Sequence, residues 1–167
     1  DERARIALEN DGRMFISLHC NSTAKGIVRG TDIYFLSEAQ TEEAREVARR
    51  ENAALAFEGK DLTSDDSVLR QIFEGMSSDQ YLKESQDLAA EIRSAVIAAG
   101  GRLKSRGVKQ AGFYVMKGTQ ARMPSVLVEM AFISNPQEER LLRRDPFLRQ
   151  IAKAIFEGIR TFKGKME

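Results

Sequence analysis

Residues 124–136, PSVLVEMAFISNP, decide the fold that we predict for this chain. Their centre, residues 125–128, is rich in β-branched residues, and a short apolar run bounded by a proline is typical of a strand buried on both faces. Glu129 ends that run, where a carboxylate is costly unless something uses or pairs it. Because ligands of open α/β sheets bind just outside the carboxyl ends of strands, Glu129 is our first candidate for a chemical role.

Length and composition narrow the function classes. A chain of 167 residues is expected to form a single domain over residues 1–167 with a substantial core. Its 26 Lys and Arg residues and 25 Asp and Glu residues leave a net charge of +1, which gives no reason to expect a nucleic-acid partner. No apolar run approaches the ~20 residues of a membrane span. We therefore expect no nucleic acid, no membrane span and a monomer.

The first residues predict a chain that continues upstream. The sequence begins at Asp1 without an initiator Met, and residues 1–10 already have the pattern of a helix interior. We therefore expect the chain to be the later part of a longer protein. The alternative is a mature, processed N-terminus.

Three more segments predict strands. Residues 14–18 (MFISL) and 31–36 (TDIYFL) are short apolar runs, and residues 113–116 form a third, shorter one. These strands alternate with helical patterns along the chain. That alternation predicts the α/β class, with a mostly parallel or mixed sheet flanked by helices.

Capping residues predict where the helices begin and end. Thr41 is expected to cap a helix, and residues 78–99 form the longest helical pattern, closed by two glycines. Asn135 is an N-cap candidate before Pro136, and Glu138 stands three positions later, close to a capping box. Residues 55–78 are the least regular part. They hold a short amphipathic stretch, which predicts either a surface helix packed on the core or a lid.

The chain's one histidine, His19, follows the strand predicted at residues 14–18. If that strand runs through Asn21, then Ser17, His19 and Asn21 share one face, and Cys20 points the other way. A lone His is more often structural than a ligand, but here two strand ends carry His19 and Glu129. If the strands are neighbours, the pair suits a metal site in which the Glu activates water.

A Cys–His nucleophilic pair is the rival chemistry, because Cys20 adjoins His19. Adjacent residues of a strand face opposite sides, so Cys20 cannot easily reach His19. As the chain's one cysteine it also forms no internal disulfide. These arguments alone indicate a hydrolase-like α/β domain.

Two motifs carry a resemblance to a known family. FISLHCNS (residues 15–22) and MPSVLVEMAFISNPQEERLL (residues 123–142) resemble the zinc-dependent N-acetylmuramoyl-L-alanine amidases, the amidase-3 family of bacterial cell-wall hydrolases. The resemblance extends over nearly the whole chain. The remaining matches are Arg3, Ile6, Ala7, Gly30, Tyr34, Phe35, Leu36, Ser37, Glu51, Asn52, Ser85, Leu88, Ala89, Val108, Gln110, Ala111, Phe113, Val115, Ile151, Ala152, Ala154, Ile155, Gly158 and Ile159.

The resemblance implies a function and roles for particular residues. His19 would be a zinc ligand, and Glu129 would be the general base that takes a proton from the attacking water. The bond cleaved would join the lactyl group of N-acetylmuramic acid to the L-Ala of the peptidoglycan stem peptide. Ser17 and Asn21 are substrate-cleft candidates. The resemblance further implies a cell-wall hydrolase of the periplasm or cell exterior, with zinc as its cofactor.

The chain departs from the family pattern in two ways. The family's first strand ends in a Gly-His-Gly-Gly type motif and is followed by a helical Glu, and neither segment occurs in these 167 residues. A catalytic zinc usually has three protein ligands, so the other two are expected upstream of residue 1, and this chain alone is expected to be inactive. Cys20 stands where the family usually has a small residue, and we expect it to be packed.

Residues 55–78 also resemble a segment found in part of this family. Amidases of this family that act in cell division carry an insert whose helix covers the zinc until a protein activator releases it. Residues 55–78 resemble a shorter version, and Glu74 or Glu58 would be the plug on the metal. Two alternatives stay open. One is a non-catalytic, amidase-like wall-binding or regulatory module, and the other is a zinc peptidase of related fold.

Overall fold

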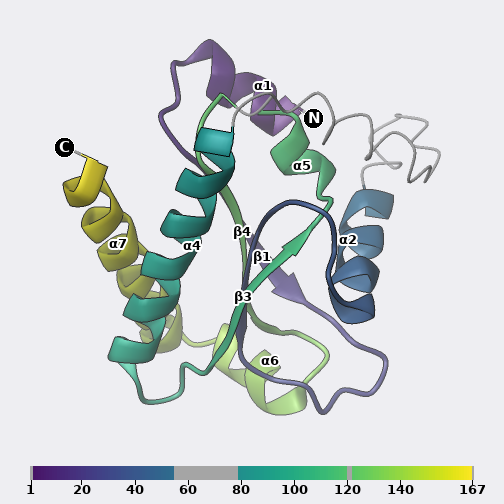
Figure 1. Ribbon diagram of the computed structural model, residues 1–167. Helices are drawn as coiled ribbons and strands as arrows, with labels where there is room; N and C mark the ends of the chain where they lie inside the picture. The colour runs from purple at the N-terminus through teal and green to yellow at the C-terminus, as the bar shows by residue number, and fades with distance from the viewer. Residues whose placement is uncertain (1, 55–78, 120–121, 167) are drawn as a thin grey trace. The chain divides into compact units, whose positions relative to one another are not determined.

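The structure is a computed structural model that describes residues 2–54, 79–119 and 122–166 (Figure 1). The predicted insert at residues 55–78, with Glu58 and Glu74, lies outside the described residues. Within the described ranges, every helix is too short or too polar to span a bilayer.

Four strands and six helices are described. The strands are β1 (Phe15–Asn21), β2 (Thr31–Leu36), β3 (Ser105–Ala111) and β4 (Ser125–Phe132). The helices are α1 (Glu2–Glu9), α2 (Glu42–Ala54), α4 (Asp79–Ala99), α5 (Tyr114–Lys117), α6 (Pro136–Leu142) and α7 (Asp145–Met166). The strands form one sheet in the order β1-β4-β2-β3.

Hydrogen bonds at the two ends of β4 show that β1 runs parallel to it. Near the start of both strands, the Phe15 N–H donates to the Pro124 carbonyl at 2.9 Å. Near their ends, the Ile133 N–H donates to the Asn21 carbonyl at 2.8 Å. The strand that carries His19 is therefore the direct neighbour of the strand that carries Glu129. This is the condition under which the sequence predicted a metal site from these two residues.

The other two strand pairs make the sheet a mixed one. The Thr31 N–H donates to the Lys104 carbonyl at 2.7 Å, just before β3 begins, so β2 and β3 run parallel. The Thr31 hydroxyl donates to the Met130 carbonyl at 3.0 Å, which places the start of β2 beside the end of β4 and makes that pair antiparallel. The predicted α/β class, a mixed sheet flanked by helices, is confirmed.

The chain divides into two compact units. The first unit comprises Asp1–Ser17, Phe35–Ser85 and Lys109–Val126, and the second comprises Leu18–Tyr34, Gln86–Val108 and Leu127–Glu167. In the first unit, the Thr41 hydroxyl accepts the Ala44 N–H at 3.2 Å, which confirms the predicted cap of α2. The Ser85 hydroxyl of α4 accepts the Ser125 N–H at 2.9 Å and so fixes the start of β4.

In the second unit, α6 begins at the predicted N-cap, but Glu138 does not play the predicted part in a capping box. The Asn135 side chain accepts the N–H groups of Gln137 and Glu138 at 3.0 and 3.2 Å, which confirms the N-cap. The Glu138 carboxylate does not complete a capping box. One of its oxygens accepts the Gly30 N–H and the other accepts the Phe132 N–H, both at 2.7 Å. Glu138 therefore ties the start of β2 to the end of β4, although burial raises the pKa of this carboxyl.

The prediction of a strand at residues 113–116 is wrong. The strand here is β3, Ser105–Ala111, and Tyr114–Lys117 form the single-turn helix α5. The reason lies in burial: β3 is at the end of the described sheet, and all but its last residue are only half-buried. Its sequence, SRGVKQA, therefore has no apolar run or alternation to mark it, whereas Tyr114, Val115 and Met116 are buried and resemble a core strand.

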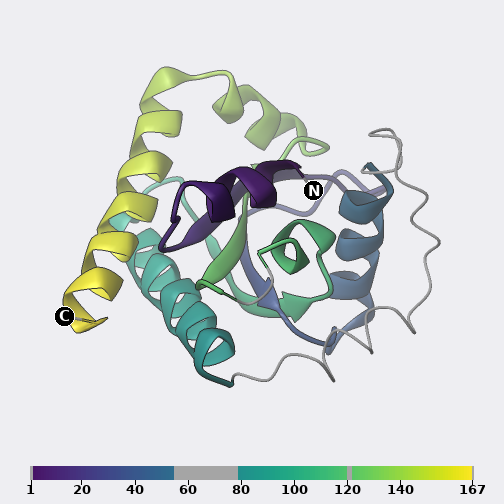
Figure 2. The same cartoon turned by 90° about the horizontal axis from the view of Figure 1, so that it is seen from above.

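The long helix α7 packs closely against α4 within the second unit, and Figures 1 and 2 both show the two helices side by side. Gly158 makes this approach possible. A Cβ added at Gly158 would lie 2.5 Å from the Ile92 Cα and 2.7 Å from the Ile92 nitrogen, both backbone atoms that cannot move aside. Ile92 and Ile151 are almost completely buried in this unit.

Replacing Gly158 tests this helix contact. We expect Gly158→Ala to lower the free energy of unfolding by about 1–3 kcal/mol, because the methyl group forces α7 away from α4. Gly164→Ala in the same helix is the matched control, since nothing lies within 4 Å of its added Cβ. The control is expected to be neutral or up to about 1 kcal/mol more stable. Urea unfolding of both variants is the measurement, and equal midpoints would contradict the close approach.

Candidate metal centre

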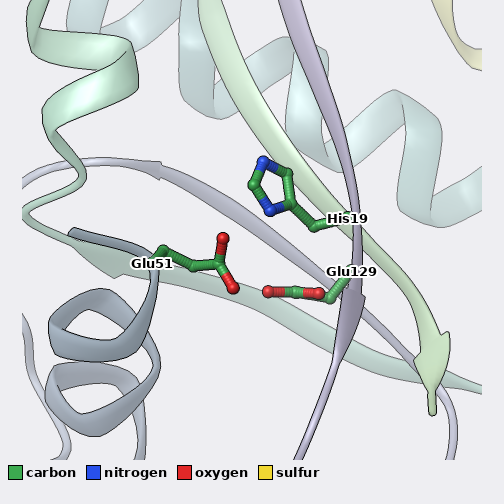
Figure 3. A group of neighbouring side chains, drawn as sticks. All are labelled: His19, Glu51 and Glu129. Carbon is green, nitrogen blue, oxygen red and sulfur yellow. The ribbon is translucent and has the colours of Figure 1, made fainter. Parts of the chain in front are cut away.

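His19 and Glu129 lie together on adjacent strands of the second unit. His19 comes from β1 and Glu129 from β4, and Figure 3 shows their side chains extending from the two strands in the same direction. A ring nitrogen of His19 and a carboxylate oxygen of Glu129 lie within 4.8 Å of each other. The structure thus brings together the two residues that the strand ends had singled out.

Glu129 is a completely buried carboxylate, with 0% of its surface exposed. It follows Val126, Leu127 and Val128, each of which is also 0% exposed. A carboxylate in such surroundings loses its hydration, and a nearby cation is the strongest means of offsetting that loss. The position is therefore suited to a metal ion.

Cys20 does not take part in this arrangement. The prediction that it is packed is wrong, because Cys20 is exposed. Leu18, two positions earlier on the same face of β1, is 53% exposed, so this side of the strand is not covered by the described residues. Partial burial and the charge of Glu129 raise the pKa of the Cys20 thiol. A thiol with a raised pKa is a poor nucleophile, which argues further against a Cys–His pair.

Ser17 and Asn21 share the strand face of His19, as the alternation along β1 predicts. Only 6% of Ser17 and 2% of Asn21 is exposed. The Asn21 side-chain oxygen accepts the Ser22 N–H at 2.8 Å, so this residue helps to shape the end of β1. Their roles in a substrate cleft stay predictions.

Glu51, which Figure 3 also labels, belongs to the first unit, where it stands on α2 and is half-buried. Sequence reasoning matched Glu51 only to the end of a helix and gave it no chemical role. A glutamate near the end of an amphipathic helix is ordinary, so the pattern holds no signal for it.

Asn52, the residue after Glu51, fixes this part of α2 within the first unit. Its side-chain amide donates to the Gly112 carbonyl at 2.8 Å, and its side-chain oxygen accepts the Tyr114 N–H at 2.9 Å. One side chain therefore satisfies two backbone groups of the segment that joins β3 to α5. Glu51 directly precedes Asn52 in the chain, so the same contacts also fix the backbone of Glu51.

The donor types of His19 and Glu129 are compatible with a zinc ion, because imidazole nitrogen and carboxylate oxygen are both common zinc ligands. The complete burial of the Glu129 carboxylate supplies the structural reason for a cation at this place.

Comparison with known proteins identifies the family. Residues 1–161 match the family model Amidase_3, described as N-acetylmuramoyl-L-alanine amidase. The chain belongs to the amidase-3 family. This amidase-3 chain is 34% identical over 163 residues to N-acetylmuramoyl-L-alanine amidase AmiA of Escherichia coli strain K12, covering 96% of the chain and 55% of AmiA. It is 32% identical over 155 residues to AmiC of Neisseria meningitidis serogroup B, covering 89% of the chain and 35% of AmiC.

Solved structures agree on the fold of this amidase-3 chain. The catalytic domain of CwlV from Bacillus (Paenibacillus) polymyxa var. colistinus matches with a TM-score of 0.64 and 22% identity, covering 98% of this chain and 64% of that one. Amidase AmiC2 of Nostoc punctiforme matches with a TM-score of 0.63 and 21% identity, with the same coverages of 98% and 64%. The chain spans about half the length of its Escherichia coli relative, 55%.

Removing the Asn52 side chain tests its part in fixing α2. We expect Asn52→Ala to lower the free energy of unfolding by about 1–3 kcal/mol, because a backbone carbonyl and a backbone N–H lose their partner together. Asn10→Ala is the control, since the exposed Asn10 side chain makes one hydrogen bond, to the Ile6 carbonyl. That change is expected to stay within about 0.5 kcal/mol. Chemical denaturation that shows equal losses for both variants would contradict the assignment.

Proposed function

We propose that this chain is part of an enzyme that carries out zinc-dependent hydrolysis of peptidoglycan, at the amide bond between N-acetylmuramic acid and the L-Ala of the stem peptide. The observation that carries the proposal is the pairing of His19 with the completely buried Glu129 on adjacent strands. Membership of the amidase-3 family supports the choice of substrate. Since peptidoglycan lies outside the cytoplasmic membrane, the proposal includes export to the periplasm or cell exterior.

We propose His19 as a ligand of the zinc ion. One of its ring nitrogens lies within 4.8 Å of a carboxylate oxygen of Glu129, and His19 is not needed as a proton carrier in the scheme below. A zinc ion in such a site supplies Lewis-acid chemistry, polarising the scissile carbonyl and lowering the pKa of water to about 7.

Glu129 is the proposed general base. In the ionised form its carboxylate takes one proton from the attacking water, and the oxygen of that water forms a bond to the carbonyl carbon. The proton then passes from Glu129 to the leaving nitrogen as the C–N bond breaks. The products are the carboxyl group of the lactyl group and the amine of L-Ala. The second proton of the water then passes from that carboxyl group to the amine, which leaves a carboxylate and an ammonium group. Water is thereby added across the amide, and Glu129 returns to its ionised form.

The role of Glu129 as a base separates it from the proposed ligand in a mutational test. We expect Glu129→Gln to retain bound zinc and to lose hydrolysis of purified peptidoglycan by about 10²–10⁴-fold, because the amide cannot accept the proton. Mass spectrometry of the products is the measurement. It must find a lactyl carboxylate and a free L-Ala amine. Glu139→Gln is the control, because Glu139 is a surface partner of Arg143. Full activity of Glu129→Gln would overturn its role.

Zinc binding is tested separately from turnover. After incubation with zinc and dialysis, we expect the unaltered protein to retain more zinc than His19→Ala. Equal zinc contents of the two proteins would contradict the proposal that His19 holds the metal. Bound zinc without any amide product would instead support a wall-binding module, and cleavage at a peptide bond would support a zinc peptidase.

A further inference from the structure

A second concave site lies entirely within the second unit. It is a cavity of about 710 Å³ formed by the loop before β2, the connection from α4 to β3, and helix α6 with the residues that follow it. Six of the side chains that line it are cationic. They are Arg29, Arg102, Lys104, Arg140, Arg143 and Arg144.

This concentration of positive charge is local. The whole chain has a net charge of only +1, from 26 basic and 25 acidic residues. Against the six cations, Glu138 is the one carboxylate among the lining residues. Both of its oxygens already accept backbone N–H groups, those of Gly30 and Phe132. Glu138 is therefore held by the fold, and its charge interacts with that of Arg29, one of the six cations. A single carboxylate leaves most of the positive charge around the cavity unbalanced.

Most of the six cations have no anionic partner. Arg143 pairs with Glu139, and Arg29 donates to the Gln137 side chain at 3.4 Å. Within the described part of the chain, the side chains of Arg102, Lys104, Arg140 and Arg144 take part in no ion pair or hydrogen bond. All four are exposed. Their charged groups are therefore free to turn towards a ligand in the cavity.

Several basic residues elsewhere on the surface are paired. Arg5, Arg49 and Arg160 each pair with a glutamate one helical turn away. The four unpaired cations around one cavity repel one another, and nothing in the fold offsets that repulsion. An anion bound among them would do so.

We propose that this cavity binds a ligand with two adjacent phosphate groups, at a site separate from the proposed metal centre. Arginine guanidinium groups bind phosphate oxygens in a bidentate manner, and three of the four unpaired cations are arginines. A phosphomonoester carries a charge of about −1.5 to −2 at pH 7, so two such groups match four cations. The same chemistry occurs in soluble phosphate compounds and in anionic lipid headgroups.

Calorimetric titration with inorganic pyrophosphate tests the proposal. We expect one pyrophosphate to bind per chain, with an affinity that falls as salt concentration rises. The triple variant Arg102→Gln, Arg140→Gln, Arg144→Gln is expected to bind at least about tenfold more weakly, because each substitution removes a charge-assisted hydrogen bond. The matched control is Arg5→Gln, Arg49→Gln, Arg160→Gln, which removes the same total charge from paired surface sites.

The outcomes separate specific binding from general charge attraction. Loss of binding in the cavity variant alone supports the site, whereas equal losses in both triple variants would overturn it. Succinate that binds as tightly as pyrophosphate would overturn the assignment to phosphate. Circular dichroism melting of both variants verifies that each remains folded, so that a loss of binding cannot be a loss of structure.

Vesicles distinguish the two sources of phosphate. Binding to vesicles that carry a lipid pyrophosphate but not to vesicles of phosphatidylcholine alone, lost in the cavity variant, supports a lipid headgroup. Pyrophosphate binding without vesicle binding supports a soluble phosphate compound. Binding of neither probe would overturn the proposal. None of these measurements involves zinc or peptidoglycan hydrolysis, so their failure is independent of the proposed function.

Discussion

The complete burial of the Glu129 carboxylate is the constraint on which the rest of the structure depends. A charge in an apolar strand costs several kcal/mol unless a partner offsets the lost hydration. The fold meets this constraint by placing β4 between β1 and β2, so that His19 of β1 lies beside Glu129. Hydrogen bonds at both ends of the β1–β4 pair fix the register on which this meeting depends. The stability of the sheet and the chemistry of the site therefore rest on the same strand pairing.

Two side chains, those of Asn52 and Glu138, each hold neighbouring segments in place by hydrogen bonding to two backbone groups. Asn52 does so for the segment between β3 and α5, and Glu138 does so for the ends of β2 and β4. Backbone N–H and C=O groups inside helices and strands are satisfied by the hydrogen bonds of those elements. Buried or half-buried backbone groups in loops need side-chain partners instead. Asn52 and Glu138 thus have structural roles, and the proposed chemistry is left to His19 and Glu129.

Charge is distributed differently in the two candidate sites. The candidate metal centre combines the imidazole of His19 with the buried carboxylate of Glu129, and this pair attracts a cation. The cavity beside α6 gathers cations with one engaged carboxylate, a set that attracts an anion. Family membership and the similarity to AmiA account for the first site. The second follows from side chains that three separate segments bring together, and the two proposals are independent of each other.

The sequence by itself determined the α/β class and the buried strand that ends at Glu129. It also determined the shared face of Ser17, His19 and Asn21 and the N-cap at Asn135. These features could be predicted because strand alternation and helix capping depend on near neighbours along the chain. Only the tertiary structure decided what depends on distant segments. It placed β1 beside β4, brought His19 next to Glu129 and left Cys20 exposed. It also formed β3 at Ser105–Ala111 and the helix α5 at Tyr114–Lys117, where an apolar run had suggested a strand, since a half-buried strand at the end of a sheet needs no apolar period. Local pattern fixes which residues form an element, whereas burial and pairing are fixed by what packs against it.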